Sequence, residues 1–355
     1  MPVPNEEISR TIDARRAVLA DETVARHYEA QPELAIRYGP AGRAKCLQDA
    51  NYHLSYLSQA IAVAAPELFA DYIGWARAML AGRNVPSTDL MANLVHLRDA
   101  LQQVLPDDMH GTTLQYVDVA LEGARAVTPS PPSFIPLAER HAELAQQYLD
   151  ALLSMDRHSA STLIMNAVQS GVGVKELYIH VFQPVQQEIG RLWQLNQVSV
   201  AQEHYCTAVT QLVMSQLYPY ILTGRTAGRT LVAACVAEDL HELGVRMVAD
   251  LFELEGWKTI YLGANTPTSS IVKTVVDQKA DVLALSATMT YHVQPVAEVI
   301  AVVRSSEARH VRILVGGYPF NRAPDLWKKI GADGYAPDAS SAIAVANELA
   351  GLPGG

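Results

Sequence analysis

A histidine between an acidic residue and a glycine stands in the loop Glu238-Asp239-Leu240-His241-Glu242-Leu243-Gly244. The loop follows a strand-like run, Thr230 to Val236, and opens a helical pattern. His241 would therefore point out of a sheet edge, where a ligand can reach it. Asp239 can accept the other ring N–H, which fixes the tautomer and raises ligand basicity, and Gly244 permits close approach. The alternative is a helix-start Asp beside a surface His.

Two more loops carry small or hydroxyl residues directly after strand-like runs. Ser286 and Thr288 follow Val282 to Leu285, and Gly316-Gly317 follow Val311 to Val315. Ligands of parallel sheets bind outside the carboxyl ends of the strands. We therefore expect these residues to leave a deep slot between strand ends, beside the histidine loop.

The order Asp-x-His-x-x-Gly, then Ser, then Gly-Gly, resembles the cobalamin-binding fold of methionine synthase and corrinoid proteins. The resemblance covers the whole segment 226–355 and implies a Rossmann-like domain. His241 would replace dimethylbenzimidazole as the lower axial ligand of cobalt, and the displaced nucleotide tail would enter the slot. The cofactor-binding residues implied are Asp239, His241, Gly244, Ser286, Thr288, Gly316 and Gly317.

In the preceding helical segment, Trp193 is followed by nine residues and then by Glu203-His204. This spacing resembles the cap of CarH-type light sensors, which implies adenosylcobalamin with Trp193, Glu203 and His204 around the adenosyl group. Those sensors carry a His directly after the Trp, where this chain has Gln194, so His180 or His204 would have to replace it. The alternative is that Trp193 fills the helical core.

Two strings near the N-terminus, Lys45 to Leu57 and Leu68 to Trp75, look like the first domain of photocobilins, which bind biliverdin beside cobalamin. The resemblance implies a bilin site with Tyr52, His53 and Tyr56. The full set of ring-bearing residues there is Tyr52, His53, Tyr56, Tyr72 and Trp75.

In such a site His53 would donate to pyrrole carbonyls, and Arg43 or Arg83 would meet propionates. The alternative is a helical core in which His53 is satisfied internally. Cys46 could attach a bilin, although a free core thiol is the more ordinary interpretation.

The elements that position these residues fall into three segments. Residues 1–126 show apolar residues at three- and four-residue spacing and predict an all-α bundle. A linker at 127–136 holds four prolines. Residues 137–225 predict a four-helix bundle, with Ser199 as a helix N-cap.

The last segment, 226–355, predicts a parallel sheet covered by helices. The expected strands are Thr230–Val236, Lys258–Leu262, Val282–Leu285 and Val311–Val315; the expected helices are Leu240–Glu255, Ser269–Lys279 and Val293–Ser305.

Composition excludes several classes of function. With 27 Lys and Arg against 37 Asp and Glu, the net charge of -10 argues against nucleic-acid binding. The three cysteines are scattered, which suggests neither a metal pair nor a disulfide framework and favours a reducing, cytoplasmic compartment. We see no signal-like run and no membrane span.

Three functions compete. The first is a cobalamin- and biliverdin-dependent photoreceptor, not an enzyme. In it, light would break the Co–C bond and change the packing of the cap, and the output would be a changed homo-oligomer or contact with a separate effector protein. The second is a corrinoid protein that carries methyl groups between methyltransferases. The third is a helical haem sensor with His53 or His96 as the iron ligand.

Overall fold

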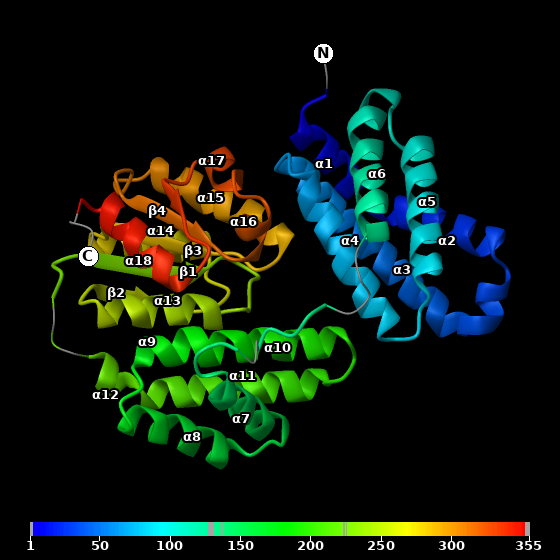
Figure 1. Cartoon of the computed structure of the whole chain (residues 1–355). Helices are drawn as coiled ribbons and strands as arrows, with labels where there is room; N and C mark the ends of the chain where they lie inside the picture. The colour runs from blue at the N-terminus through cyan, green and yellow to red at the C-terminus, as the bar shows by residue number, and fades with distance from the viewer. Residues whose placement is uncertain (1–2, 127–130, 136–137, 223, 225, 352–355) are drawn as a thin grey trace. The chain divides into compact units, whose positions relative to one another are not determined.

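A computed structural model describes residues 3–126, 131–135, 138–222, 224 and 226–351. The chain forms two compact units. The first contains the helices before residue 127 together with residues 289–294 and 322–329, and the second contains the other described residues (Figure 1). Half of the predicted linker, residues 127–130 and 136, lies outside the described residues, as does residue 225 at the predicted boundary of the last segment. No helix among the described residues is long and apolar enough to cross a membrane.

The first unit is helical, as the spacing of its apolar residues predicts. Its helices are α1 Asn5–Ala14, α2 Arg16–Ala30, α3 Glu33–Ala62, α4 Pro66–Ala81, α5 Ser87–Val104 and α6 His110–Ala126, with a short 3-10 turn η1 at Asp107–Met109. Pro66 occupies the first turn of α4, and Pro86 immediately precedes α5. A kink at Gly39, where φ is 61°, divides α3 ahead of Pro40.

A second group of helices opens the second unit: α7 Ala142–Leu153, α8 Arg157–Gln169, α9 Val174–Leu177, α10 Gln183–Gln194, α11 Val200–Gln216 and α12 Tyr218–Ile221. A π-helical turn, Tyr178–Phe182, joins α9 to α10.

The apolar stripe Leu177, Val181, Val185 and Ile189 is buried throughout. Its spacing of four residues would drift around an α-helix of about 3.6 residues per turn. The wider π turn inside the stripe offsets that drift and keeps the four side chains on one face. Ser199 caps α11 as predicted, in a capping box with Gln202.

A five-stranded parallel sheet forms the centre of the last segment. Its strands are β1 Thr230–Cys235, β2 Lys258–Tyr261, β3 Val282–Ser286, β4 Arg312–Gly316 and β5 Gly334–Tyr335, in the order β2-β1-β3-β4-β5. The four predicted strands are confirmed. The sequence analysis missed β5, because two residues show no periodicity.

Helices cover this sheet: α13 Leu243–Leu254, α14 Thr268–Gln278, α15 Val293–Arg304 and α18 Ala339–Leu349 (Figure 1). This part of the chain also holds the short helices α16 Tyr318–Arg322 and α17 Leu326–Lys329 and a 3-10 turn, η3, at Thr290–His292. The predicted helix at Leu240 begins three residues later, at Leu243. The backbone N–H of His241 bonds to the Asp239 carboxylate instead, so residues 239–242 form a loop.

The strand order places a reversal between β1 and β3. From β1 the chain runs outward to β2 and then returns past β1 to β3. Ligands of such sheets bind in the crevice at this switch point. Cys235, Ser286 and Gly316 are aligned across β1, β3 and β4, so the three loops predicted to carry chemistry leave the sheet side by side.

We predict that Gly317→Ala destabilises the chain by about 2–4 kcal/mol, measured by urea unfolding of the cofactor-free protein. Gly317 has φ +102°, and a Cβ there would lie 2.1 Å from the carbonyl oxygen of Ala287. Gly190→Ala in α10 is the matched control, since its Cβ would meet no atom within 4 Å. It should gain up to about 1 kcal/mol. Equal stabilities of the two variants would contradict this explanation of Gly317.

Candidate functional site

A buried carboxylate fixes the orientation of the predicted ligand His241. Its Nδ1 lies 2.9 Å from Asp239 Oδ1, and its backbone N–H donates to the same oxygen at 3.0 Å. The Asp239 side chain is 0% exposed, whereas that of His241 is 56% exposed. Since a carboxylate only accepts, Nδ1 carries the proton and Nε2 keeps its lone pair for a ligand.

The second oxygen of Asp239 connects this loop to the loop after β3. Thr288 donates its backbone N–H to Asp239 Oδ2 at 2.9 Å. The predicted residue Thr288 thus meets the site through its main chain. Asp239 therefore bridges the two loops that flank the switch point.

A strained turn directs Asp239 inward. Glu238 has φ 68°, an uncommon conformation for a residue other than glycine. Its N–H donates to Asn265 Oδ1 at 2.8 Å, and the N–H of Asn265 donates to the carbonyl of Asp239 at 2.9 Å. Sequence analysis did not single out Asn265, which lies in the loop after β2.

The surface beside His241 is open and partly apolar. Leu240 is 71% exposed, and a Cβ added to Gly244 would meet no atom within 4 Å. Among the described residues, no group of three or more His, Cys, Asp or Glu could hold a metal ion. A metal bound at Nε2 would therefore need its other ligands from a cofactor. One imidazole donor beside an apolar, open face fits a planar metal macrocycle such as a corrin.

Gly316 is the last residue of β4, and Gly317 directly follows the strand. Gly317 has φ +102°, and its missing Cβ lets the Ala287 backbone approach; a Cβ at Gly316 would lie 3.1 Å from the carbonyl of Ala336. Both glycines therefore allow close packing of the protein's own backbone. Ser286 is the last residue of β3, and in the sheet it pairs with Cys235 of β1 on one side and with Gly316 of β4 on the other. The slot for a nucleotide tail stays a prediction.

The residue after the histidine, Glu242, is a site residue that sequence analysis missed. Its carboxylate accepts from Gln211 Nε2 at 2.8 Å, from Tyr261 Oη at 2.8 Å and from the N–H of Ala264 at 3.1 Å. These donors lie 19–31 residues away in the chain, so no local spacing could have indicated them.

The predicted cap residues lie at two adjoining helix ends. Trp193 is half-buried in the last turn of α10, next to the buried Gln194. Glu203 lies in the first turn of α11, and His204 follows it. Glu203 accepts from Thr207 Oγ1 at 3.2 Å and lies 3.5 Å from His204 Nε2. Their contact with a cofactor stays a prediction, as does that of His180, which lies in the π turn.

Most ring-bearing residues of the bilin prediction contact one another in the first unit. His53 is buried, with Nδ1 2.9 Å from Tyr72 Oη, and Tyr72 stacks on Tyr56 at a centroid distance of 3.7 Å. Burial lowers the pKa of His53 to about 4, so it is a neutral core residue. Tyr52 is 51% exposed instead. The alternative of an internally satisfied His53 describes this geometry.

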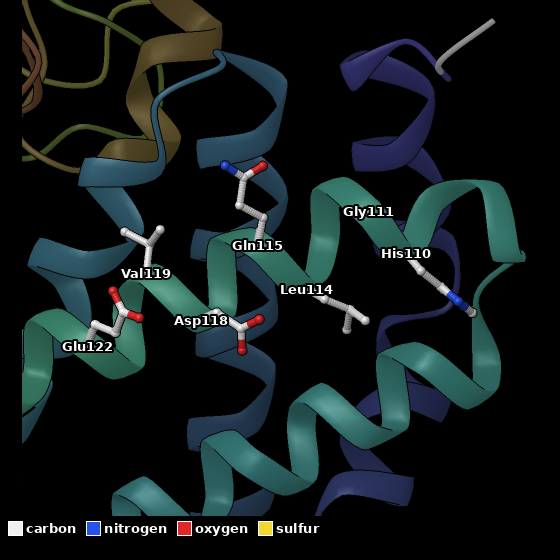
Figure 2. Close-up of a pocket in the computed structure, with 7 residues that line it drawn as sticks. All are labelled: His110, Gly111, Leu114, Gln115, Asp118, Val119 and Glu122. Carbon is white, nitrogen blue, oxygen red and sulfur yellow. The ribbon is translucent and has the colours of Figure 1, made fainter.

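Two other features of this unit carry none of the predicted chemistry. Burial raises the pKa of the Cys46 thiol to about 11, which makes it a poor nucleophile. A hollow of about 540 Å³ lies along α6, lined by His110, Leu114, Asp118 and their neighbours on one helix face (Figure 2). It includes none of the predicted site residues.

Comparison with known proteins agrees with the geometry of the second unit. A B12 binding domain model matches residues 229–344, and a further B12 binding domain model matches residues 144–218. The solved monomethylamine corrinoid protein of Methanosarcina barkeri shares the fold, with a TM-score of 0.53 and 19% identity, over 59% of this chain and 100% of that one.

The relatives are corrinoid proteins. The dimethylamine corrinoid protein of Methanosarcina barkeri is 28% identical over 58% of this chain and 97% of its own length. Dimethylamine corrinoid protein 3 of Methanosarcina mazei is 31% identical over 34% of this chain and 71% of its own. The chain belongs to this family of cobalamin-binding corrinoid proteins. With dimethylamine corrinoid protein 2 of Methanosarcina acetivorans the match spans only 55% of that protein.

These relatives correct the leading functional prediction. Their names describe methylamine corrinoid proteins, which matches the second hypothesis, whereas the photoreceptor hypothesis is wrong. Biliverdin, the CarH-type resemblance and the light-dependent homo-oligomer depended on that hypothesis and find no support. The Trp and Glu-His spacing misled because helix ends that flank one short loop recur in many helical bundles.

We predict that Asp239→Ala weakens cobalamin binding by about 10- to 100-fold, because it releases the His241 ring and both loop amides. Asp281→Ala is a matched control. Asp281 accepts from the N–H of Thr230 and from Arg229 at the N-terminal ends of β1 and β3, away from the site. It should cost stability and leave affinity unchanged. Equilibrium titration with cobalamin measures the affinity of both variants. Equal affinities of Asp239→Ala and Asp281→Ala would contradict the role assigned to Asp239.

We predict that α3 and α4 lose about 2 kcal/mol of stability between about pH 7 and about pH 5. The unfolded chain binds a proton at His53 near its ordinary pKa of 6.5, whereas the folded chain resists protonation until about pH 4. Stability therefore falls as pH falls through this window. Hydrogen exchange of the two helices, corrected for intrinsic rates, measures it. His53→Gln should flatten the pH dependence of stability. An equally steep pH dependence in that variant would contradict its assignment to His53.

Proposed function

We propose that this chain is a corrinoid carrier of methyl groups, with His241 Nε2 as the lower axial ligand of cobalt. The observation that supports this most directly is the buried Asp239 carboxylate, which holds Nδ1 and leaves Nε2 toward open space at the switch point of the sheet. The methylamine corrinoid relatives support the kind of group carried.

A bound corrinoid would supply a cobalt centre that accepts and gives up a methyl group. The protein's residues bind and orient it. Asp239 keeps the proton on Nδ1, so that the basicity of Nε2 rises. Leu240 offers an apolar surface beside the imidazole, and Gly244 leaves room for the ring edge. Ser286, Thr288, Gly316 and Gly317 would line the path of the nucleotide tail.

The helices α7 to α11, here called the cap, would cover the opposite face of the corrin. Trp193 would shield that face from water with its indole ring, and Glu203 and His204 would flank it. A methyl group is small and apolar, and an indole surface suits it. The upper ligand in this proposal is therefore methyl rather than adenosyl.

The chain itself would not be an enzyme in this proposal. The residues proposed for the site hold a cofactor, and donor and acceptor would be activated by separate methyltransferases that dock in turn on the corrin face. A basic surface for nucleic acid is not expected at a net charge of -10.

The test is uptake of a labelled methyl group by the chain loaded with cobalamin. After reduction of the cobalt and addition of radiolabelled methyl iodide, about one label per chain should remain through gel filtration. Cofactor-free protein is the control and should retain none. Absence of retained label on the loaded chain would contradict the carrier function.

A second arm tests whether the chain is an enzyme. Labelled dimethylamine, given to the loaded and reduced chain alone, should transfer no label, because the proposed activation lies in a partner. Uptake of label from dimethylamine without any partner would show that the chain catalyses the transfer itself.

A further inference from the structure

A row of polar pairs joins the cap helix α11 to α13, the helix that follows the histidine loop. Gln211 Nε2 donates to Glu242 Oε1 at 2.8 Å, and one turn further along both helices Arg246 Nη2 donates to Ser215 Oγ at 2.7 Å. Beyond the end of α11, Tyr218 Oη of the short helix α12 donates to Asp250 Oδ1 at 3.1 Å. The first pair differs from the others because Glu242 directly follows His241.

Glu242 is also tied to the neighbouring strand. Its Oε2 accepts from Tyr261 Oη and from the N–H of Ala264. Gly263 has φ +81°, and a Cβ there would lie 3.2 Å from that oxygen, so the loop leaves room for the carboxylate. Burial and the bond to Glu242 raise the pKa of Tyr261 well above its usual value, so the phenol stays a donor.

The main chain of His241 is thus supported on both sides. Asp239 accepts from its N–H, and the buried Cys235 thiol lies 3.6 Å from its carbonyl oxygen. Beyond that carbonyl, the next anchor of the loop is the Glu242 carboxylate with its three donors.

We infer that Glu242 is a positioning residue for the lower axial ligand, and that through Gln211 the cap helix α11 takes part in holding His241 at cobalt. The inference rests on the proposed ligation by His241. Without Glu242 the loop would keep Asp239 but lose its attachment to α11 and β2. The imidazole would then leave the metal more often, while the corrin stays bound.

The experiment uses the full chain loaded with cobalamin and reduced to the Co(II) state. Electron paramagnetic resonance of protein made with ¹⁵N-histidine distinguishes the two forms. An axial imidazole then splits each cobalt line into a doublet, whereas the cofactor's own dimethylbenzimidazole would give triplets, and a spectrum without the doublet is here called unsplit. The wild-type chain should show this splitting, and His241→Ala should lack it. Glu242→Ala should shift the balance about tenfold toward the unsplit form, since it removes an acceptor from three donors.

Conservative and matched variants separate positioning from general damage. Glu242→Gln should restore the splitting, because the new side chain keeps an oxygen for Tyr261 and Ala264 and the Gln211 amide can rotate to meet it. Gln211→Ala, which removes only the contribution of the cap, should shift the balance about threefold. Ser215→Ala removes one bond between the same two helices and should leave the spectrum unchanged.

Full splitting in folded Glu242→Ala would overturn the inference, and so would an effect of Ser215→Ala as large as that of Gln211→Ala. If circular dichroism shows that Glu242→Ala does not fold, Gln211→Ala becomes the test. An unchanged paramagnetic resonance spectrum of Gln211→Ala would then overturn the inference. A wild-type chain without the doublet would instead overturn the ligation by His241, and the inference with it. The two failures are therefore distinguishable.

Discussion

A carboxylate removed from water must find donors for both of its oxygens, and this requirement organises the second unit. Asp239 meets it with the ring and main chain of His241 and with the main chain of Thr288. The same three bonds turn the histidine outward, fix its tautomer and join the loops after β1 and β3. The site is thus a consequence of satisfying one buried charge.

Sheet topology explains why the loops joined by Asp239 lie together at the carboxyl ends of the strands. The order β2-β1-β3-β4-β5 makes the connections from β1 and β3 leave on different sides, which opens a crevice between them. Gly317 closes the neighbouring gap by its contact with the Ala287 backbone. Glu242, with donors from α11 and β2, extends the support of His241 to the cap.

Much of the fold and the centre of the site could be predicted from the sequence. Strands with continuous apolar runs are local signals, and so is the spacing from Asp239 to His241. The partners of Glu242 are not, because Gln211 and Tyr261 come from other elements, and β5 is too short to show a period. The function was misjudged because helix-end residues such as Trp193, Glu203 and His204 fit several upper ligands. His53 misled because a buried core histidine and a ligand look alike in sequence.

The claim that His241 Nε2 binds cobalt is tested most directly by isotopic substitution. The wild-type chain, loaded with cobalamin and reduced to the Co(II) state, is compared by electron paramagnetic resonance with the same protein made with ¹⁵N-histidine. A nitrogen of spin one splits each line into three and a nitrogen of spin one half into two. The account predicts that labelling changes triplets into doublets. Triplets that persist after labelling, or lines without nitrogen splitting in both samples, would contradict it.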